Sequence, residues 1–265
     1  MTTNKDKYFQ INSIVKLFRM LDTLVSKSEW ELAKLANEIN IPKTTVLRML
    51  LTLKSLGYVD QTELGKRYYA TAKLFEIGSK AIPNINILNI SQPIMARLAD
   101  KCDETVYLSV LSGIDIVVVA KISSRHYLKV DSYVGDRIKS YQSSSGKALL
   151  TGMSSKHRAE MFNNHQFEQV TTKGISSLAE LEAELSKILA RGYSLVDEEK
   201  YIGIRSVAVP IFDHRNETIA ALSAVAPKVR LKMKNIPQLA GLVTEAANEI
   251  TQKLGGTNVW SLSRN

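Results

Sequence analysis

The chain has 265 residues, 45% hydrophobic and 23% charged, and its single cysteine excludes an intramolecular disulfide and a cysteine-rich zinc site. No stretch approaches the roughly 18 apolar residues that a membrane-spanning helix needs, and residues 1–7 are polar where a secretory signal is apolar. We therefore expect a cytosolic protein without a metal or other cofactor, and the length predicts two domains.

Positive charge is concentrated near the N-terminus. The formal net charge of the chain is +9. Residues 1–70 contain 11 Lys and Arg against 7 Asp and Glu, a net charge of +4, and residues 91–265 carry the same net charge over a much longer stretch. This distribution favours a polyanionic partner for the N-terminal part.

Two amphipathic helices are predicted first. Apolar residues spaced three and four apart predict a helix with one buried stripe. They are Ile11, Ile14, Val15, Phe18, Leu21 and Val25. Ser28 and Glu31 then have the spacing of a capping box, in which each side chain satisfies a free backbone N–H at a helix start. The helix predicted after it buries Leu32, Leu35, Ala36 and Ile39.

A third helix is predicted to begin at Pro42, because proline fits a first helical turn but cannot continue a helix. It ends at Gly57, the usual residue for a left-handed cap. Its inner face is Val46, Met49, Leu50 and Leu53, and its outer face carries Lys43, Thr44, Thr45 and Arg48. Lysine at a helix N-terminus suits phosphate, and threonine and arginine suit base edges, so this face predicts reading of the DNA major groove.

A basic hairpin follows the third helix. Residues 58–61 and 67–70 are predicted to pair around a turn that contains Gly65. Lys66 and Arg67 near the tip suit phosphate or minor-groove contacts. Together these elements predict a winged helix-turn-helix domain over residues 8–70 that binds double-stranded DNA. A sensor or dimerisation adaptor that contacts protein through the same helices is the alternative.

The rest of the chain predicts an α+β domain with an antiparallel sheet and helices packed on it. A linker helix, weakened at Pro83, is expected over residues 71–90, the larger domain over 91–253 and a tail over 254–265. The expected strands are 105–111, 114–122, 127–134, 193–196, 205–212 and 218–225. The expected helices are one containing Ile94, Leu98 and a buried Cys102, then 146–151, 155–162 and 178–190, and a last one with apolar residues from 239 to 250.

The segment from Tyr141 to Leu150 combines three serines and a glycine with the start of an apolar helix. Free N–H groups at such a start predict a site for a carboxylate or phosphate, and a plain serine cap with nothing bound is the alternative. Ser144 and Lys147 also have the S-x-x-K spacing of serine acyl enzymes. Because the companion S-D-N and K-T-G motifs do not occur and the four histidines are dispersed, we expect a protein that is not an enzyme.

Four motifs, in this order, resemble those of IclR-type transcriptional regulators over residues 8–253. They are residues 41–48 (IPKTTVLR), 145–150 (SGKALL), 198–206 (EEKYIGIRS) and 209–223 (VPIFDHRNETIAALS). The resemblance implies a winged helix-turn-helix, a linker helix and a GAF-like effector-binding domain, assembled as dimers or dimers of dimers. It also implies a repressor that a small organic acid controls.

In members of this family the acid lies between the start of the Gly-Lys-Ala helix and the last strands. By matching position, the resemblance assigns the effector to Ser144, Ser145, Gly146, Ile204, Ser206, Ser223 and Val225. Val196, Ser206 and Val225 replace an acidic residue, a cysteine and a serine of some members that sense two- and three-carbon keto acids. Residues 54–59 and 73–78 resemble the branch that represses the uptake and breakdown of pectin-derived sugar acids, which implies a 2-keto-3-deoxy sugar acid as the effector.

Overall fold

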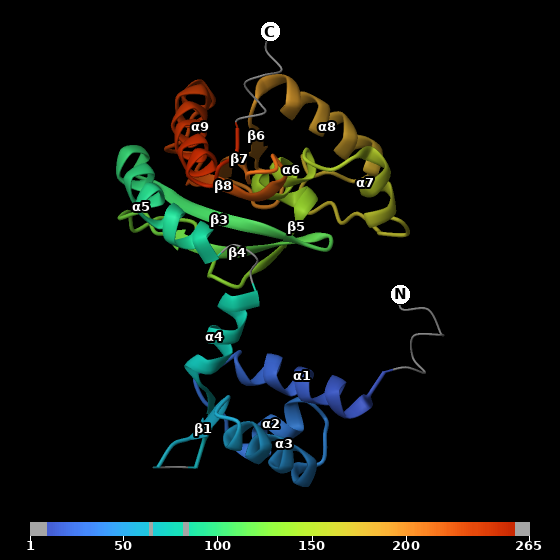
Figure 1. Cartoon of the computed structure of the whole chain (residues 1–265). Coiled ribbons are helices and arrows are strands. Elements are labelled where there is room, and N and C mark those ends of the chain that lie inside the picture. The colour runs from blue at the N-terminus through green and yellow to red at the C-terminus, as the bar shows by residue number, and fades with distance from the viewer. Residues whose placement is uncertain (1–9, 64–65, 82–84, 258–265) are drawn as a thin grey trace. The chain divides into compact units, whose positions relative to one another are not determined.

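A computed structural model describes residues 10–63, 66–81 and 85–257. The chain divides into two compact units, residues 1–85 and residues 86–265. Figure 1 shows short helices and a small hairpin in the first unit, and a twisted sheet with helices on both faces in the second. The predicted α+β organisation, with an N-terminal helix-turn-helix unit, is confirmed.

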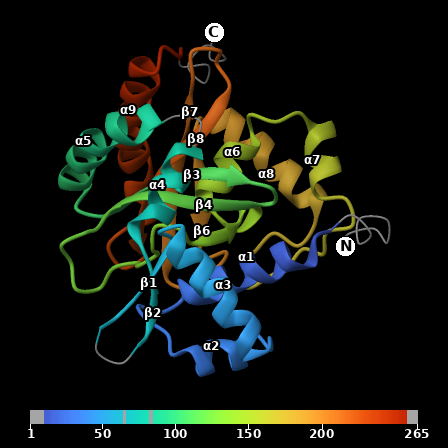
Figure 2. The same cartoon turned by 60° about the horizontal axis from the view of Figure 1, so that its bottom comes forward.

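The first unit folds around one cluster of buried apolar side chains, to which three helices and the hairpin contribute. Leu24, Leu35, Leu50 and Val59 are among its members. Figure 2 shows the helices of this unit with the hairpin beside them. Its elements are α1 (Asn12–Leu24), α2 (Leu32–Glu38), α3 (Lys43–Ser55), β1 (Val59–Gln61), β2 (Tyr68–Ala70) and α4 (Ala72–Ala81).

The first helix forms where the sequence predicts it, but the predicted buried stripe is wrong. Ile11 and Phe18 are 62% and 60% exposed, and the other stripe residues except Leu21 are also exposed. Met20 and Leu24 are buried instead. Two apolar stripes share this helix, and periodicity alone does not determine which of them faces the core of its own chain.

The capping box predicted before α2 is also wrong. The helix begins at Leu32, with Glu31 in the cap position and no side-chain hydrogen bond to the helix start. Trp30 forms a β-bridge with Tyr68, its N–H donating to the Tyr68 carbonyl at 2.8 Å. The bridge holds the chain extended just before Leu32. The Glu31 carboxylate accepts from Lys34 instead, and this hydrogen bond lowers the pKa of Glu31.

The third helix has the predicted inner face: Val46, Leu50 and Leu53 are buried. Pro42 lies in the cap position just before the helix, one residue earlier than the first helical turn in which the sequence places it. Gly57 has φ +79°, as the predicted left-handed cap requires.

The predicted hairpin is confirmed over slightly shorter strands. β1 and β2 are antiparallel, with Val59 opposite Ala70 and Gln61 opposite Tyr68. Gly65, the predicted turn residue, lies outside the described residues, as does Pro83, where the sequence weakens the linker.

The second unit is built on one antiparallel sheet with the strand order β5-β4-β3-β8-β7-β6. Its strands are β3 (Thr105–Ser112), β4 (Asp115–Ile122), β5 (Arg137–Lys139), β6 (Ser194–Asp197), β7 (Ile204–Phe212) and β8 (Thr218–Pro227). Its helices are α5 (Ile85–Cys102), α6 (Ser144–Leu150), α7 (Ser155–Met161), α8 (Leu178–Arg191) and α9 (Ile236–Lys253), with short 3₁₀ turns at Ser140–Gln142 and Met233–Asn235.

The two faces of this sheet carry different cores. Alternate residues of β3, β7 and β8, such as Leu108, Val209 and Leu222, pack with α5 and α9 on one face. Ala208 and Ala221 face the opposite way and pack with α6. Further out, α6, α7 and α8 share a third cluster around Tyr141 (Figure 1). Because side chains alternate along a strand, the serines that follow the second alternation point towards α6.

The strand predicted over residues 127–134 is wrong. These residues form an irregular segment, and the strand that pairs with β4 is Arg137–Lys139. Tyr107 holds the irregular segment with its side chain, since its hydroxyl donates to the Val130 carbonyl and accepts from the Ser132 N–H. Residues 127–134 therefore have the composition of a strand but do not pair with a neighbouring strand.

The linking region is divided differently from the sequence prediction. The helix predicted from Ala72 to Leu88 corresponds to α4, which ends at Ala81, and to the first residues of α5. Ser91 lies inside α5, which also accommodates Pro93. The first helix of the second unit is therefore longer than the sequence indicates. Cys102, predicted to be buried, is only partly buried at the end of α5, and this burial raises the pKa of its thiol.

Candidate functional site

The outer face of α3 presents the residues that the sequence predicts for DNA. Lys43, Thr44 and Arg48 are exposed, and Thr45 is half-buried. No ion pair of Lys43 or Arg48 occurs within the described part of the chain. The buried side chains of Val46 and the other inner residues fix the orientation of this helix. The face is therefore free of competing acids and positioned by the core beneath it.

The two hairpin cations differ in their surroundings. Lys66 is exposed, with φ 50°, and makes no ion pair with a described residue. Arg67 is bound to two carboxylates of its own unit, at 2.6 Å from Glu29 and 3.4 Å from Glu31. Lys66 is thus available to a phosphate, whereas Arg67 must release an acid to contact one.

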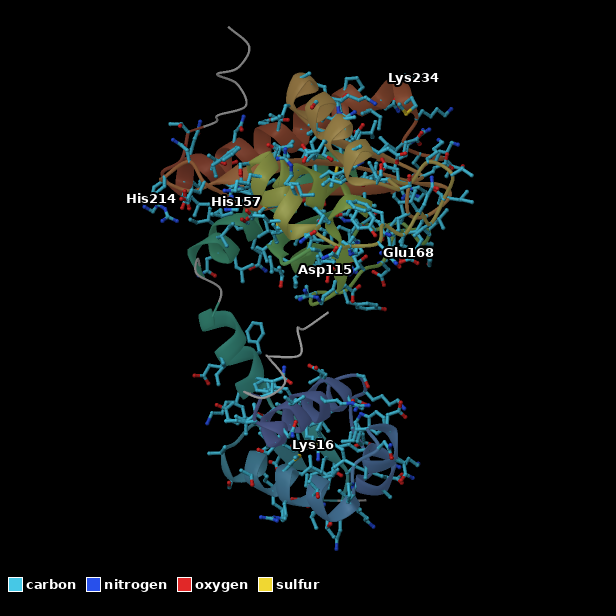
Figure 3. The ribbon with its side chains drawn as sticks, turned by 90° about the vertical axis from the view of Figure 1, so that its right-hand side faces the viewer. Lys16, Asp115, His157, Glu168, His214 and Lys234 are labelled. Atoms are coloured by element: carbon cyan, nitrogen blue, oxygen red, sulfur yellow. The ribbon has the colours of Figure 1, made fainter. Side chains whose placement is uncertain are left out.

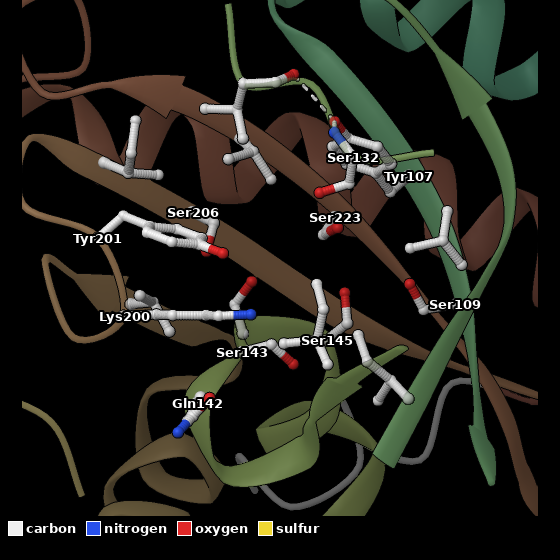
Figure 4. A pocket seen from close by; sticks show the side chains of 18 residues that line it. Tyr107, Ser109, Ser132, Gln142, Ser143, Ser145, Lys200, Tyr201, Ser206 and Ser223 are labelled. Carbon is white, nitrogen blue, oxygen red and sulfur yellow. Dashed lines mark hydrogen bonds between the residues drawn. The ribbon is translucent and has the colours of Figure 1, made fainter. Parts of the chain in front are cut away.

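A cavity lies in the second unit, on the face of the sheet that α6 covers (Figure 4). Its empty space amounts to about 610 Å³, a figure that includes open solvent at its mouth. Strands β3, β4, β7 and β8 form its floor, the start of α6 one wall, and the β6–β7 loop another. Its lining combines apolar side chains such as Ile116 and Val118 with many hydroxyls.

Six of the seven predicted effector residues line this cavity. They are Ser144, Ser145, Ile204, Ser206, Ser223 and Val225. The register explains the grouping, because Ser206 lies opposite Val225 and Ser223 lies opposite Ala208 in the pair β7–β8. Gly146 does not line the cavity. A Cβ at this position would lie 2.2 Å from the Ser140 carbonyl oxygen, so glycine is needed there for close packing of α6 on the preceding turn.

The start of α6 is capped by its own chain. Ser143 is the capping residue, and its hydroxyl accepts from the Gly146 N–H at 2.9 Å. A serine cap, which the sequence allows as the alternative to an anion site, therefore occupies the Gly146 N–H. Lys147 is 0% exposed, and its ammonium binds Glu199 at 2.7 Å and the Leu195 carbonyl at 3.1 Å.

The β6–β7 loop, residues 198–203, is held by charged side chains on several sides. Lys147 holds Glu199, whose pKa burial raises despite this ammonium. Glu198 accepts from Lys228 and from the Gly203 N–H, and these hydrogen bonds lower its pKa to about 2. Thr171 donates to the Glu198 carbonyl at 2.7 Å. The loop is therefore fixed in position over the cavity.

Sequence reasoning missed several residues of the cavity. Tyr107 and Ser109 come from β3, Ser132 from the irregular segment, and Lys200 and Tyr201 from the loop. The alternation along β3 was a usable signal, since Tyr107 and Ser109 interrupt an apolar strand at every second position. The loop residues carry no such signal, because their direction depends on contacts distant in sequence.

Other candidate groups stay apart from the cavity. His157 and His214 are exposed on the second unit (Figure 3). His126 contacts Asp103, and His165 packs against Tyr141. In the described ranges, no cluster of three or more metal-ligating side chains occurs, and no helix is long and apolar enough to cross a membrane.

Two family descriptions match the chain. The IclR helix-turn-helix domain matches residues 13–63, and the C-terminal domain of the bacterial transcriptional regulator IclR matches residues 79–252. The chain belongs to the IclR family. The two matches follow the division into a DNA-binding unit and a sheet unit. IclR proteins are DNA-binding transcriptional regulators and not enzymes, so the hypothesis of a serine acyl enzyme is wrong for this chain.

Similar IclR proteins cover nearly the whole chain. The HTH-type transcriptional regulator KdgR of Dickeya chrysanthemi is 32% identical over 92% of this chain and 80% of its own length. The acetate operon repressor of Salmonella typhimurium is 30% identical over 94% and 92%. A solved IclR homologue from Microbacterium hydrocarbonoxydans, complexed with 4-hydroxybenzoate, has the same fold, with a TM-score of 0.81 and 20% identity over 91% of this chain and 98% of its own.

The geometry explains why S-x-x-K spacing has no catalytic meaning here. A lysine that activates a serine needs a free amine directed at the hydroxyl. The Lys147 ammonium is turned to Glu199 and Leu195 and is fully buried between α6 and the β6–β7 loop. Lys147 in this IclR protein therefore connects two walls of the cavity.

Proposed function

We propose that this protein is a repressor that acts in the cytoplasm and leaves its operator when a small organic acid binds the cavity of the second unit. The observation that carries the proposal is the cavity itself, which brings six of the predicted effector residues to one place behind α6. The DNA-binding unit and the acid site lie in separate units of one chain. Such a separation suits a regulator in which one ligand changes the affinity for another.

In this proposal α3 reads the operator. Lys43 and the helix N-terminus contact phosphate, and Thr44, Thr45 and Arg48 reach base edges in the major groove. Lys66 contacts the DNA backbone or the adjacent minor groove. Arg67 contacts a DNA phosphate only if it releases the carboxylates of Glu29 and Glu31. The exposure of Lys43, Arg48 and Lys66 supports this assignment.

Effector binding is assigned to the six cavity residues, with Ser206 and Ser223 as hydrogen-bond donors to the acid and its hydroxyls. The resemblance of residues 54–59 and 73–78 to the sugar-acid branch of the family favours a 2-keto-3-deoxy sugar acid. The homologue complexed with 4-hydroxybenzoate supports a carboxylate in general. The hydroxyls of the lining, Ser206 and Ser223 among them, are groups to which the hydroxyls of a sugar acid can hydrogen-bond.

Two or four copies of the chain form the functional unit in this proposal. The apolar residues Ile14, Val15 and Phe18 are exposed on one face of α1, with Ile11 exposed just before it, and Phe75 of α4 is 75% exposed. Apolar groups of this kind favour association with a second copy. An acid in the cavity then shifts the arrangement of the copies, so that two α3 helices no longer match half-sites one turn apart.

Fluorescence anisotropy on the DNA upstream of the protein's own gene, against a scrambled duplex, tests the proposal. We expect tight specific binding that 2-keto-3-deoxygluconate releases, and an affinity that falls steeply with salt as phosphate contacts release counterions. Arg48→Ala should cost about 1 to 3 kcal/mol of discrimination, and Lys66→Ala should weaken both duplexes alike.

Lys16→Ala serves as the control, since Lys16 is an exposed cation of α1 and not of the reading helix α3 (Figure 3). It should change neither affinity nor discrimination appreciably. Equal losses on both duplexes for Arg48→Ala would reject Arg48 as a reader. Specific binding that ignores the acid would keep the regulator and reject this effector, and affinity without salt dependence would favour the adaptor hypothesis.

A further inference from the structure

Lys200 extends into the cavity from the β6–β7 loop, beside the ring of Tyr201 (Figure 4). Its ammonium lies 5.0 Å from the centre of that ring. The acids around it are already engaged by other cations: Asp197 by Arg205, Glu198 by Lys228 and Glu199 by Lys147. Within the described chain, the Lys200 ammonium has no ion-pair or hydrogen-bond partner.

Lys200 also determines the charge of the cavity. Among the described residues that line it, Lys200 is the only one with a charged side chain. The other polar groups are hydroxyls and the amide of Gln142. The cavity therefore holds one positive charge and no acid, which disfavours a cationic ligand and favours one with a negative group near the loop.

The backbone that carries this charge is held in place before any ligand arrives. Glu199, the neighbouring residue, is tied to the buried Lys147, and Glu198 is tied to the Gly203 N–H at 2.9 Å. A loop held at both of these points needs little ordering of its backbone around Lys200 when a ligand binds. Preorganisation of this kind increases affinity, because less conformational entropy is lost.

The start of α6 supplies less for an anion than its sequence indicates. Its Gly146 N–H already donates to the Ser143 hydroxyl, and the helix has only seven residues. A full cation makes a shorter and stronger hydrogen bond to a carboxylate than neutral donors do. Lys200 is therefore the only charged donor that the described lining offers to an acid, beside the neutral groups at the start of α6.

We propose that Lys200 pairs with the anionic group of the effector and selects acids over neutral molecules of the same shape. The proposal rests on the proposed function, in which the cavity binds an organic acid. The carboxylate lies against Lys200 at the loop, and the hydroxyl-bearing remainder of the ligand lies on the strands at Ser206 and Ser223. Tyr201 keeps the ammonium directed into the cavity through its ring.

Isothermal titration calorimetry on the full chain tests this assignment. The probes are 2-keto-3-deoxygluconate, pyruvate and 4-hydroxybenzoate, with pyruvamide and 4-hydroxybenzamide as uncharged counterparts of the last two. The variants are Lys200→Gln and Lys200→Arg. Lys156→Gln is the matched control, because Lys156 is an exposed cation of α7 that does not line the cavity.

Lys200→Gln should lower the affinity for the acid that binds wild type by roughly tenfold or more, because the substitution removes a charge-assisted hydrogen bond. The affinity of Lys200→Gln for the uncharged amide should differ from that of wild type by less than about twofold. Lys200→Arg should retain most of the affinity for the acid, and Lys156→Gln should behave as wild type. Thermal melting of the free variants should show that both are folded, since among the described residues the Lys200 ammonium contacts only the Tyr201 ring.

An acid affinity of Lys200→Gln close to wild type, or an equal loss for acid and amide, overturns the assignment. If no acid in the panel binds wild type, the assignment fails together with the effector. DNA binding is measured without any acid, so it still decides separately whether the protein is a regulator.

Discussion

The buried ion pair between Lys147 and Glu199 makes a sharp prediction for the second unit. Lys147→Met keeps the length and the apolar stem of the side chain but removes the ammonium. The change deletes hydrogen bonds to both Glu199 oxygens, at 2.7 and 2.9 Å, and to the Leu195 carbonyl at 3.1 Å. It leaves a carboxylate with 13% exposure in contact with a methionine.

The expected cost is large because one partner of a buried pair is removed. Breaking such a pair costs about 3 to 5 kcal/mol, since the remaining charge is buried without compensation. The exposed pair of Lys101 and Glu245 is the matched control, with its atoms 3.4 Å apart and both side chains more than half exposed. Lys101→Met should cost less than about 1 kcal/mol.

The pH dependence has a definite sign. Burial raises the pKa of Glu199 above its ordinary 4.5, and loss of the Lys147 ammonium raises it further. An acid whose pKa is higher in the folded protein than in the unfolded chain stabilises the fold below its unfolded pKa. This stabilisation is lost as pH rises through the pKa of the folded protein. The cost of Lys147→Met should therefore be smallest near pH 5 and grow towards pH 8.

Chemical denaturation of wild type, Lys147→Met, Glu199→Gln and the double variant measures the coupling. The double variant should cost less than the sum of the single ones, by about 0.5 to 3 kcal/mol. Additive costs, or a cost for Lys147→Met no larger than that for Lys101→Met, would refute the reasoning. Because the pair holds the loop, Lys147→Met should also weaken acid binding in the calorimetric assay.

Two further predictions concern close packing and acid stability. Gly146→Ala places a Cβ 2.2 Å from the Ser140 oxygen and should cost about 1 to 3 kcal/mol, whereas Gly241→Ala, with nothing within 4 Å inside α9, should gain about 0.5 to 1 kcal/mol. Thermal melts compare them, and a similar effect of both changes would contradict the close contact. Hydrogen bonds led by that from Lys228 lower the pKa of Glu198 to about 2, so its stabilisation is complete above pH 4.5 and is lost as pH falls towards 2. Thermal melts followed by circular dichroism from pH 5 to 2 should show that the stability of Glu198→Gln depends less on pH than that of wild type. An equal pH dependence of the two stabilities would argue against these hydrogen bonds.

Local sequence signals predicted most elements well where one physical rule dominated. The third helix follows from Pro42 and Gly57 at its ends, and the hairpin from β-rich stretches around a turn. The helix predicted over residues 178–190 is observed as α8, Leu178–Arg191, with Ser177 capping its start and Gly192, at φ 80°, at its end. Such signals depend on a few neighbouring residues, so they survive any tertiary arrangement.

The errors occur where two local signals compete or where a distant residue decides. The first helix has two apolar stripes, and only the packing of α2 and α3 selects Met20 and Leu24. Ser28 and Glu31 have the spacing of a capping box, but the box does not form because the bridge between Trp30 and Tyr68 holds the chain extended. Residues 127–134 have strand composition, but contacts to Tyr107 bind them as an irregular segment.

The sequence by itself determined the order of most elements and the basic outer face of α3, because these follow from periodicity and residue type. The serines of the later strands were implied by the resemblance to the IclR family. Only the tertiary structure decided which of these residues share a cavity. Register and strand alternation brought Ser206 and Ser223 to the side of α6. The ion pair of Lys147 and Glu199, 52 residues apart in the chain, placed Lys200 over them. Contacts across such distances depend on the whole fold, and no local pattern encodes them.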